Sequence, residues 1–280
     1  KIIMIIWLAS YPKSGNTWIR SFLCAYLFLD LDKESFSFDV LRHIPSFPNK
    51  KLFNAHGLDP KNLQEVAETW IKVQRKINLN KKINFLKTHN ASGNYNKHYF
   101  TDKDNTLGAI YIVRDPRDVL VSYSRYIKKN IRETLKLIQS DNHIGFLEDY
   151  EGVEGEIRGS WSQHYNSWKN FNIKETIIIK YEDLIEDPFE NFLKVINYLN
   201  KLFKLKVDEE KIKKCIKITN FNNLQNLEKK TGYKEKLTNN LEVPFFNTGK
   251  TKQWQKELDQ KTINIIEKKF EKEMRELNYI

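Results

Sequence analysis

The chain has few of the residues from which disulfide frameworks and structural metal sites are built. Only two of its 280 residues are cysteine, Cys24 and Cys215, and they lie far apart in the sequence. Two scattered cysteines form neither a disulfide framework nor a zinc site. No convincing cluster of histidine, cysteine and aspartate ligands is present either, so the sequence predicts a protein without a metal, in a reducing, cytoplasmic location.

Long hydrophobic runs, repeats and low-complexity tracts are also missing. The apolar run at residues 2–8 is too short to cross a bilayer and has no signal-peptide cleavage pattern, so a membrane location is not favoured. A chain of this length suits one large domain with a substantial core, here taken as residues 1–280.

Negative charge is in deficit, which gives a formal net charge of +11. The cations are mostly lysine, 38 against 9 arginines, and they are spread along the chain without a long basic block. A charge dispersed in this way does not favour nucleic acid as a partner.

What the sequence does contain is an abrupt transition after its first apolar run. Residues 2–8 lead into a turn that holds Lys13, Ser14 and Gly15, and apolar residues recur at helical spacing from Trp18 onward. A strand, a small-residue loop and a helix direct backbone N–H groups and a helix dipole at an anion. Lys13 adds positive charge there. Because it precedes the glycine, the loop differs from the nucleotide-kinase pattern.

Further apolar runs each lead into a turn and then a helix, at residues 84–87, 107–113 and 176–180. The alternation of strand and helix predicts an α/β fold of three layers, with a central parallel sheet and a P-loop-like nucleotide-binding architecture. In such folds ligands bind at the carboxyl ends of the strands. Since Lys13, His89, Arg114 and Tyr181 each follow a predicted strand, we expect one crevice to gather them.

Helix boundaries can also be predicted. Asp115 and Asp187 each precede a proline, which is typical of a helix start. Residues 260–278 have helical spacing throughout. Residues 30–82 and 128–161 are less regular, and we expect helices and loops that wall the substrate cavity. The acidic residues between 141 and 156 are expected in a solvated loop, with a lid that favours cationic acceptors as the alternative.

Several segments resemble one enzyme family. Residues 11–18, Tyr-Pro-Lys-Ser-Gly-Asn-Thr-Trp, are similar to the 5′-phosphosulfate loop of sulfotransferases that use PAPS, 3′-phosphoadenosine 5′-phosphosulfate. Residues 111–122 resemble their 3′-phosphate-binding strand and helix, and residues 85–89 resemble the strand with the catalytic histidine. Residues 181–188 and 219–221 look like further landmarks, and all five segments occur in the family's order.

The resemblance implies a donor, PAPS, its product PAP, an acceptor that is a small molecule or a carbohydrate, and no metal. It implies Lys13, His89 and Ser122 as catalytic residues, with His89 as the general base and Lys13 stabilising the leaving phosphate. The residues implied in donor binding are Lys13, Ser14, Gly15, Asn16, Thr17, Trp18, Arg114, Ser122, Tyr181, Thr219, Phe221, Asn247, Thr248 and Gly249.

The chain departs from the family pattern near its C-terminal end. Asn247 and Thr248 stand where the family usually has Arg-Lys, a pair that holds the 3′-phosphate, and Lys252 stands where it has a glycine. Lys250 and Lys252 are candidates for replacing the missing charge. The alternative is weaker PAPS binding or a somewhat different donor.

Other interpretations stay open at this point. A P-loop nucleotide kinase that uses ATP and Mg²⁺ is disfavoured by the position of Lys13 and by the Arg114–Ser122 pair. A non-catalytic nucleotide-binding protein of the same fold is favoured only by the missing Arg-Lys pair. The sequence identifies neither the acceptor nor the oligomeric state, for which a homodimer is one option.

Some residues also have a purely structural interpretation. Trp18 is as well explained by core packing as by stacking on adenine. Arg117 is expected to be a solvated or structural helix residue, and Arg114 has a local pair with Asp118 as its alternative role. Three residues at helical spacing are expected to form a packing stripe: Trp161, His164 and Trp168.

Overall fold

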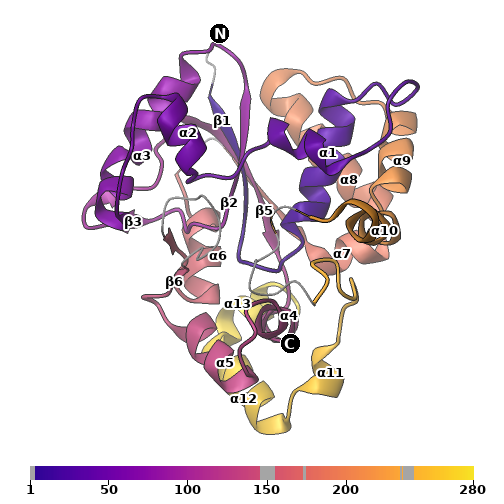
Figure 1. Cartoon of the computed structure of the whole chain (residues 1–280). Helices are drawn as coiled ribbons and strands as arrows, with labels where there is room; N and C mark the ends of the chain where they lie inside the picture. The colour runs from indigo at the N-terminus through magenta and orange to yellow at the C-terminus, as the bar shows by residue number, and fades with distance from the viewer. Residues whose placement is uncertain (1–3, 146–154, 173–174, 234, 236–242) are drawn as a thin grey trace.

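The computed structural model describes residues 4–145, 155–172, 175–233, 235 and 243–280. At its centre is a parallel sheet of four strands in the order β2-β1-β5-β8 (Figure 1). The strands are β1 (Ile5–Ser10), β2 (Asn84–Thr88), β5 (Thr106–Val113) and β8 (Thr176–Lys180). They coincide with the four apolar runs, so the predicted α/β fold with a central parallel sheet is confirmed.

The register of the strands brings their carboxyl ends together. Ser10, the last residue of β1, lies opposite Ile112 of β5, and Val113 at the end of β5 lies opposite Lys180 of β8. The segments that follow these strands therefore leave the sheet at one edge, as the sequence predicted.

Alternate residues of each strand face opposite sides of the sheet, and each side has its own core. On one side, Ile6, Leu8 and Ile110 are fully buried in a cluster with residues of the neighbouring helices. The main helices on this side are α1 (Asn16–Phe28), α8 (Pro188–Phe203) and α9 (Glu209–Ile218). Figure 1 shows them together on one side of the strands.

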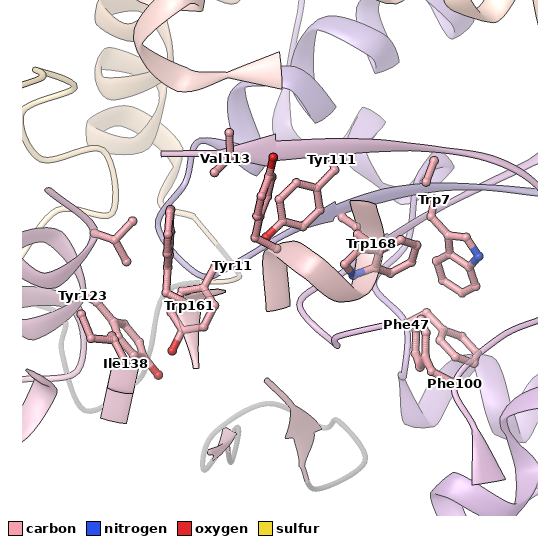
Figure 2. Packing of buried hydrophobic residues seen from close by; sticks show 14 of the residues in the cluster. Trp7, Tyr11, Phe47, Phe100, Tyr111, Val113, Tyr123, Ile138, Trp161 and Trp168 are labelled. Carbon is pink, nitrogen blue, oxygen red and sulfur yellow. The ribbon is translucent and has the colours of Figure 1, made fainter. Parts of the chain in front are cut away.

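The opposite side of the sheet is rich in aromatic residues (Figure 2). The Trp7 ring centroid lies 5.0 Å from that of Phe100 and 6.2 Å from that of Trp168. The helices on this side are α3 (Leu63–Asn78), α4 (Pro116–Tyr126), α5 (Ile131–Gln139), α6 (Trp161–Lys169), α12 (Gln260–Lys269) and α13 (Glu271–Glu276). With helices on both sides of the sheet, the predicted three layers are present.

The remaining elements outside the central sheet and its main helices are mostly short. The helical ones are η1 (Phe38–His43), α2 (Lys50–Ala55), α7 (Tyr181–Glu186), α10 (Phe221–Thr231) and α11 (Trp254–Glu257). The strands are two antiparallel pairs, β3 (Asn94–Tyr95) with β4 (His98–Tyr99), and β6 (Ile144–Gly145) with β7 (Glu156–Ile157). The described residues of the less regular stretches, 30–82 and 128–161, thus contain helices and loops, with β6 and β7 in the second stretch. Four of their residues line the cavity described below: Ser46, Pro48, Glu156 and Arg158.

The predicted helix starts are confirmed, whereas the C-terminal segment differs from its prediction. The carboxylates of Asp115 and Asp187 cap α4 and α8 by accepting hydrogen bonds from backbone N–H groups. The spacing over residues 260–278 predicted continuous helix, but α12 and α13 meet at Phe270, which has φ −115° and ψ 20°. This break leaves both Phe270 and Met274 fully buried, and the Phe270 ring lies 5.3 Å from Trp161.

Two further observations concern the chain as a whole. Cys24 and Cys215 are both buried and free. Among the described residues, none of the helices combines the length and the apolar character needed to cross a bilayer. One domain over residues 1–280 stays a prediction.

Candidate active site

A cavity lies at the carboxyl edge of the sheet, and segments far apart in the sequence contribute to its walls. Among the residues predicted for the site, those that line it are Lys13, Gly15, Asn16, Thr17, Trp18, His89, Arg114, Ser122, Tyr181, Phe221, Asn247, Thr248 and Gly249. Ser14 and Thr219 do not line it. Thr219 is fully buried and its hydroxyl donates to the Cys215 carbonyl, 2.8 Å away.

The loop between β1 and α1 has the form of an anion cradle. Lys13 and Gly15 have left-handed backbone conformations, with φ 65° and φ 99°. In the described part of the chain, the backbone N–H groups of residues 14–17 have no hydrogen-bond acceptor, and the buried Ser14 hydroxyl has no partner. A helix N-terminus with such free donors favours a bound anion.

Asn16 fastens this loop to the sheet. Its side-chain amide donates to the Leu8 carbonyl and to the Ser10 hydroxyl, both at 3.2 Å. The side chain is buried, so its main contacts are with β1. Asn16 thus positions the loop, and its backbone N–H group is free to donate to an anion.

The Lys13 ammonium lies between two aromatic rings. Its Nζ is 4.4 Å from the Tyr126 ring centroid and 4.1 Å from that of Phe245. Burial, followed by the nearby positive charge of Arg114, lowers the pKa of Lys13 to about 7. An anion bound beside this ammonium would therefore raise the Lys13 pKa again.

Arg114 connects the first loop to the C-terminal loop. Its guanidinium donates to the Lys13 carbonyl at 3.1 Å and to the Lys250 carbonyl at 2.9 Å, and it lies over the Tyr181 ring. The contact with Asp118 is longer, at 3.8 Å, so a local pair is only part of its role. The buried Nε of Arg114 has no partner within the described residues.

Asp118 holds the C-terminal loop from the same helix. Its two carboxylate oxygens accept hydrogen bonds from the backbone N–H groups of Lys252, at 2.7 Å, and Trp254, at 3.1 Å. Neither Lys250 nor Lys252 lines the cavity, so the structure does not bring the two candidate replacement cations to it. Arg125 does line it.

The sequence interpretation missed Arg125, although a signal was available. It lies three residues after Ser122 on α4, and residues at this spacing share a helix face. Its guanidinium donates to the Gln253 side chain at 2.9 Å and pairs with Glu257. Arg117, in contrast, is structural as expected: it is buried, pairs with Asp115 and Glu267, and stacks on Trp254.

His89 follows β2 and has a defined tautomer. Its Nδ1 lies 2.8 Å from the Ser10 carbonyl oxygen, which can only accept, so we assign the proton to Nδ1 and leave Nε2 bare. Burial, and then the positive charges of Lys87 and Arg158, lower the pKa of His89 well below its usual range. The imidazole is therefore neutral near pH 7.

Helix α6 holds the segments that follow β2 and β5. Its three ring N–H groups donate to backbone carbonyls: Trp161 to Arg114 at 3.2 Å, His164 to His89 at 3.1 Å, and Trp168 to Asn90 at 2.9 Å. All three side chains are fully buried, and Figure 2 shows both tryptophans beneath the sheet. The predicted packing stripe is thus also the support of the site.

His164 has both ring nitrogens occupied. Nε2 donates to the His89 carbonyl, and Nδ1 accepts from the Tyr111 hydroxyl at 2.9 Å. Burial lowers the pKa of His164 to about 3. A neutral ring is required for this arrangement, because a protonated Nδ1 could not accept.

On the far side of His89, the cavity is lined by charged residues that the sequence interpretation missed. Glu156 was expected in a solvated acidic loop, but it is only 3% exposed and pairs at 2.6 Å with Arg158, which is 6% exposed. Their alternation around Ile157 was a usable signal for a shared strand face. Other acids of that stretch lie outside the described residues: Glu148, Asp149, Glu151 and Glu154.

Comparisons with known proteins agree with the motifs. A family model described as Sulfotransferase domain matches residues 5–278. Sulfotransferase 1E1 of Homo sapiens is 27% identical over 276 residues, which cover 96% of this chain and 83% of that protein. Flavonol 3-sulfotransferase of Flaveria bidentis is 24% identical over 275 residues, covering 96% and 81%.

Solved structures show the same fold. Retinol dehydratase, in a crystal structure with androsterone and the inactive cofactor PAP, matches with a TM-score of 0.62 at 17% identity. The match covers 96% of this chain and 80% of that one. The sequence matches confirm the resemblance and the enzyme class that the motifs indicated, and the structural match shows the fold.

Replacing Gly15 by alanine is expected to destabilise the protein by about 3 kcal/mol. The new Cβ would lie 2.4 Å from the Tyr181 ring, in a backbone conformation with φ 99°. Gly57→Ala is the matched control, because its φ is 68° but nothing lies within 4 Å of the added Cβ. It should cost only about 1 kcal/mol. Urea unfolding measures both, and equal losses would contradict the close contact with Tyr181.

His164→Phe should make the stability of the protein less dependent on pH. The folded pKa of His164, about 3, lies below the unfolded value, so the wild-type protein loses stability as the pH falls below about 6.5. This one residue accounts for a loss of about 2 kcal/mol between pH 6.5 and pH 5. The free energy of unfolding at both pH values tests this; an unchanged difference in the variant would show that His164 is not held neutral.

Proposed function

The chain belongs to the sulfotransferase family, and from this premise we propose that it transfers the sulfuryl group of PAPS in line to a hydroxyl or amine of a small-molecule or glycan acceptor. The observation that carries the proposal is the meeting of three features in one cavity: a loop of free backbone donors, the Lys13 cation and a neutral His89 with a bare Nε2.

The first loop fits the 5′-phosphate of such a donor. Its free N–H groups and the N-terminus of α1 suit an anion, and Lys13 adds a cation beside them. We propose that Lys13 neutralises the charge that develops on the leaving phosphate oxygen.

The 3′-phosphate would lie farther along α4. Arg114 and Ser122 line the cavity there, as does Arg125, and the buried Nε of Arg114 has no partner among the described residues. We propose that Arg125 provides the positive charge for the 3′-phosphate that the Arg-Lys pair provides in other members of the family. Asn247, Thr248 and Gly249 complete this wall.

Trp18 and Phe221 form the apolar part of the donor site. Both line the cavity, and the buried Nε1 of Trp18 has no partner among the described residues. Trp18 also packs in the core, with its ring 5.6 Å from Phe192, so its two interpretations are compatible. Tyr181 supports this wall by donating to the Gly249 carbonyl at 3.0 Å, whereas Thr219 lies behind it.

In the proposed reaction, His89 takes up the proton of the acceptor and Lys13 stabilises the negative charge on the leaving phosphate. The acceptor hydroxyl gives its proton to Nε2 of His89 while its oxygen forms a bond to sulfur. The bond from sulfur to the phosphate oxygen breaks, and PAP leaves with that oxygen beside Lys13. Such group transfers depend mainly on positioning and electrostatics, which the fixed His89 and the first loop provide.

Three statements from the sequence stay predictions for this enzyme: a cytoplasmic location, the absence of a metal requirement, and the oligomeric state. The kinase alternative is separated from the proposal by its ligand, because a kinase would be stabilised by ADP with Mg²⁺ and not by PAP. Thermal unfolding with each ligand distinguishes them.

His89→Ala is expected to lower PAPS-dependent sulfation by about 10²-fold or more, because the proton acceptor is lost. Stabilisation by PAP in thermal unfolding should persist, since His89 does not contribute to the proposed phosphate sites. His43→Ala, an exposed histidine outside the cavity, is the control and should keep full activity. An active His89→Ala enzyme would remove His89 from the base role.

Binding of PAP at pH 8 should take up nearly one proton. Lys13, with a pKa of about 7, is mostly neutral in the free protein at that pH, and a bound phosphate restores its charge. Below about pH 6 the uptake should vanish, because Lys13 is already charged. Calorimetry in two buffers of different ionisation enthalpy measures the protons. Uptake that persists in Lys13→Met would assign it to another group.

A further inference from the structure

The half of the cavity beyond His89 has an unusual wall. Besides His89 it includes two carboxylates, Glu156 and Glu235, and two cations, Lys87 and Arg158. These residues come from three separate segments of the chain, and the first loop contributes none of them. If the first loop and α4 hold the donor, this half is where the acceptor binds.

The segment that carries Glu156 and Arg158 is fixed next to His89. The Ala91 N–H donates to the Ile157 carbonyl at 2.8 Å, and the Ile157 N–H donates to the Asn90 side chain at 2.8 Å. Both partners directly follow His89 in the sequence. Glu156 and Arg158 flank Ile157, so both point to the opposite side of this short strand.

The Arg158 side chain is held in one position by its contacts in this wall. Its guanidinium donates to the Tyr123 hydroxyl at 2.5 Å and lies against the backbone of Gly145, where an added Cβ would come within 2.0 Å of it. Two further donors, Nε and Nη2, go to the same oxygen of Glu156, at 3.1 and 2.6 Å. The pair is therefore rigidly held and lacks overall charge.

The second carboxylate oxygen of Glu156 has no partner among the residues that the structure describes. Oε2 accepts both hydrogen bonds from Arg158, while Oε1 accepts none from any described residue, although Glu156 is only 3% exposed. The Lys87 ammonium likewise makes no hydrogen bond or ion pair in the described part of the chain. Because Glu156 lines the cavity, this free acceptor oxygen can receive a hydrogen bond from a ligand bound there.

The charges of the wall limit the chemistry of that ligand. Glu156 is neutralised by Arg158, and Glu235 by Arg20 at 2.5 Å, which leaves the Lys87 cation in excess. A cationic acceptor would be repelled by Lys87. A flat apolar acceptor with one hydroxyl would cover Glu156 and Lys87 without providing partners, which carries a desolvation penalty.

We propose that the acceptor is a neutral polyhydroxylated molecule, a sugar or a cyclitol, which places one hydroxyl at Nε2 of His89 and a second as donor to Oε1 of Glu156. Oxygens of the remaining hydroxyls accept from Lys87. This inference rests on the proposed sulfuryl transfer and adds the class of acceptor to it.

The test is a competition between two classes of acceptor with PAPS as donor. Methyl glycosides and inositols represent the polyhydroxylated class, and 1-naphthol and a 3-hydroxysteroid represent the apolar class with one hydroxyl. We expect kcat/KM at least about tenfold higher for the best polyhydroxylated acceptor. Preferred sulfation of the apolar class, or no sulfation of any polyhydroxylated member, overturns the inference.

Substitutions of Glu156 and Arg158 test whether these two residues determine the preference for the acceptor. Glu156→Gln should raise KM for the best polyhydroxylated acceptor about tenfold or more, because the amide group that replaces Oε1 cannot accept. The double variant Glu156→Leu, Arg158→Met keeps the wall filled and removes both charges together, so neither is left unpaired. It should reverse the preference toward 1-naphthol. Glu210→Gln, at an exposed acid of α9, is the control, and an unchanged preference in both wall variants contradicts the proposal.

Thermal unfolding of the same protein preparations with PAP distinguishes a failure of the proposed function from a failure of the proposed acceptor class. If PAP does not stabilise the protein, the proposed function itself fails. If PAP stabilises it and 1-naphthol is the better acceptor, the donor assignment stands and only the acceptor class is wrong.

Discussion

The site depends on the hydrogen bonds that helix α6 donates to the backbone beyond the sheet. Trp161 and His164 bind the carbonyls of Arg114 and His89, the residues at which the chain leaves β5 and β2. These carbonyls would otherwise be buried acceptors without donors, so the packing of α6 and the position of the site are inseparable. The same helix fixes Arg114, the proposed phosphate-binding residue, at one strand end and His89, the proposed proton acceptor, at the other, although it contributes no group to the cavity wall.

The cavity at this edge of the sheet has two halves, which differ in whether their polar and charged groups already have partners. The proposed donor half holds the free N–H groups of residues 14–17, the Lys13 cation, and Arg114, whose contact with Asp118 is long at 3.8 Å. Such groups are unfavourable without an anion and are stabilised when one binds. In the proposed acceptor half both carboxylates are already paired, Glu156 with Arg158 and Glu235 with Arg20, and Lys87 has no ion-pair partner among the described residues. His89 lies between the halves, and burial keeps it neutral.

The sequence was sufficient for the sheet and for much of the site, because both follow from local patterns. Buried parallel strands appear as continuous apolar runs, and the residue after each run must lie at the carboxyl edge, which places Lys13, His89 and Arg114 together. The alternation of Glu156 and Arg158 indicates a shared strand face, but the burial of the pair could not be predicted, because it depends on where β7 lies relative to the end of β2, a long-range contact. The break at Phe270 is also tertiary in origin, since helical spacing continues through it and only packing against Trp161 distinguishes the two helices. Lys250 and Lys252 were reasonable candidates by position, but Asp118 binds the backbone of their loop and neither side chain lines the cavity.

The central claim is that the fold holds His89 neutral, with its proton on Nδ1 and Nε2 open to the cavity. Long-range nitrogen–proton correlation spectra of protein labelled with ¹⁵N-histidine test it most directly, with His89→Ala used to assign the signals. Near neutral pH, we expect a protonated Nδ1 and a bare Nε2 for His89, and the reverse tautomer for His164, whose Nε2 donates to the His89 carbonyl. A proton on Nε2 of His89, or a doubly protonated ring, would contradict the account, because no acceptor for the substrate proton would then face the cavity.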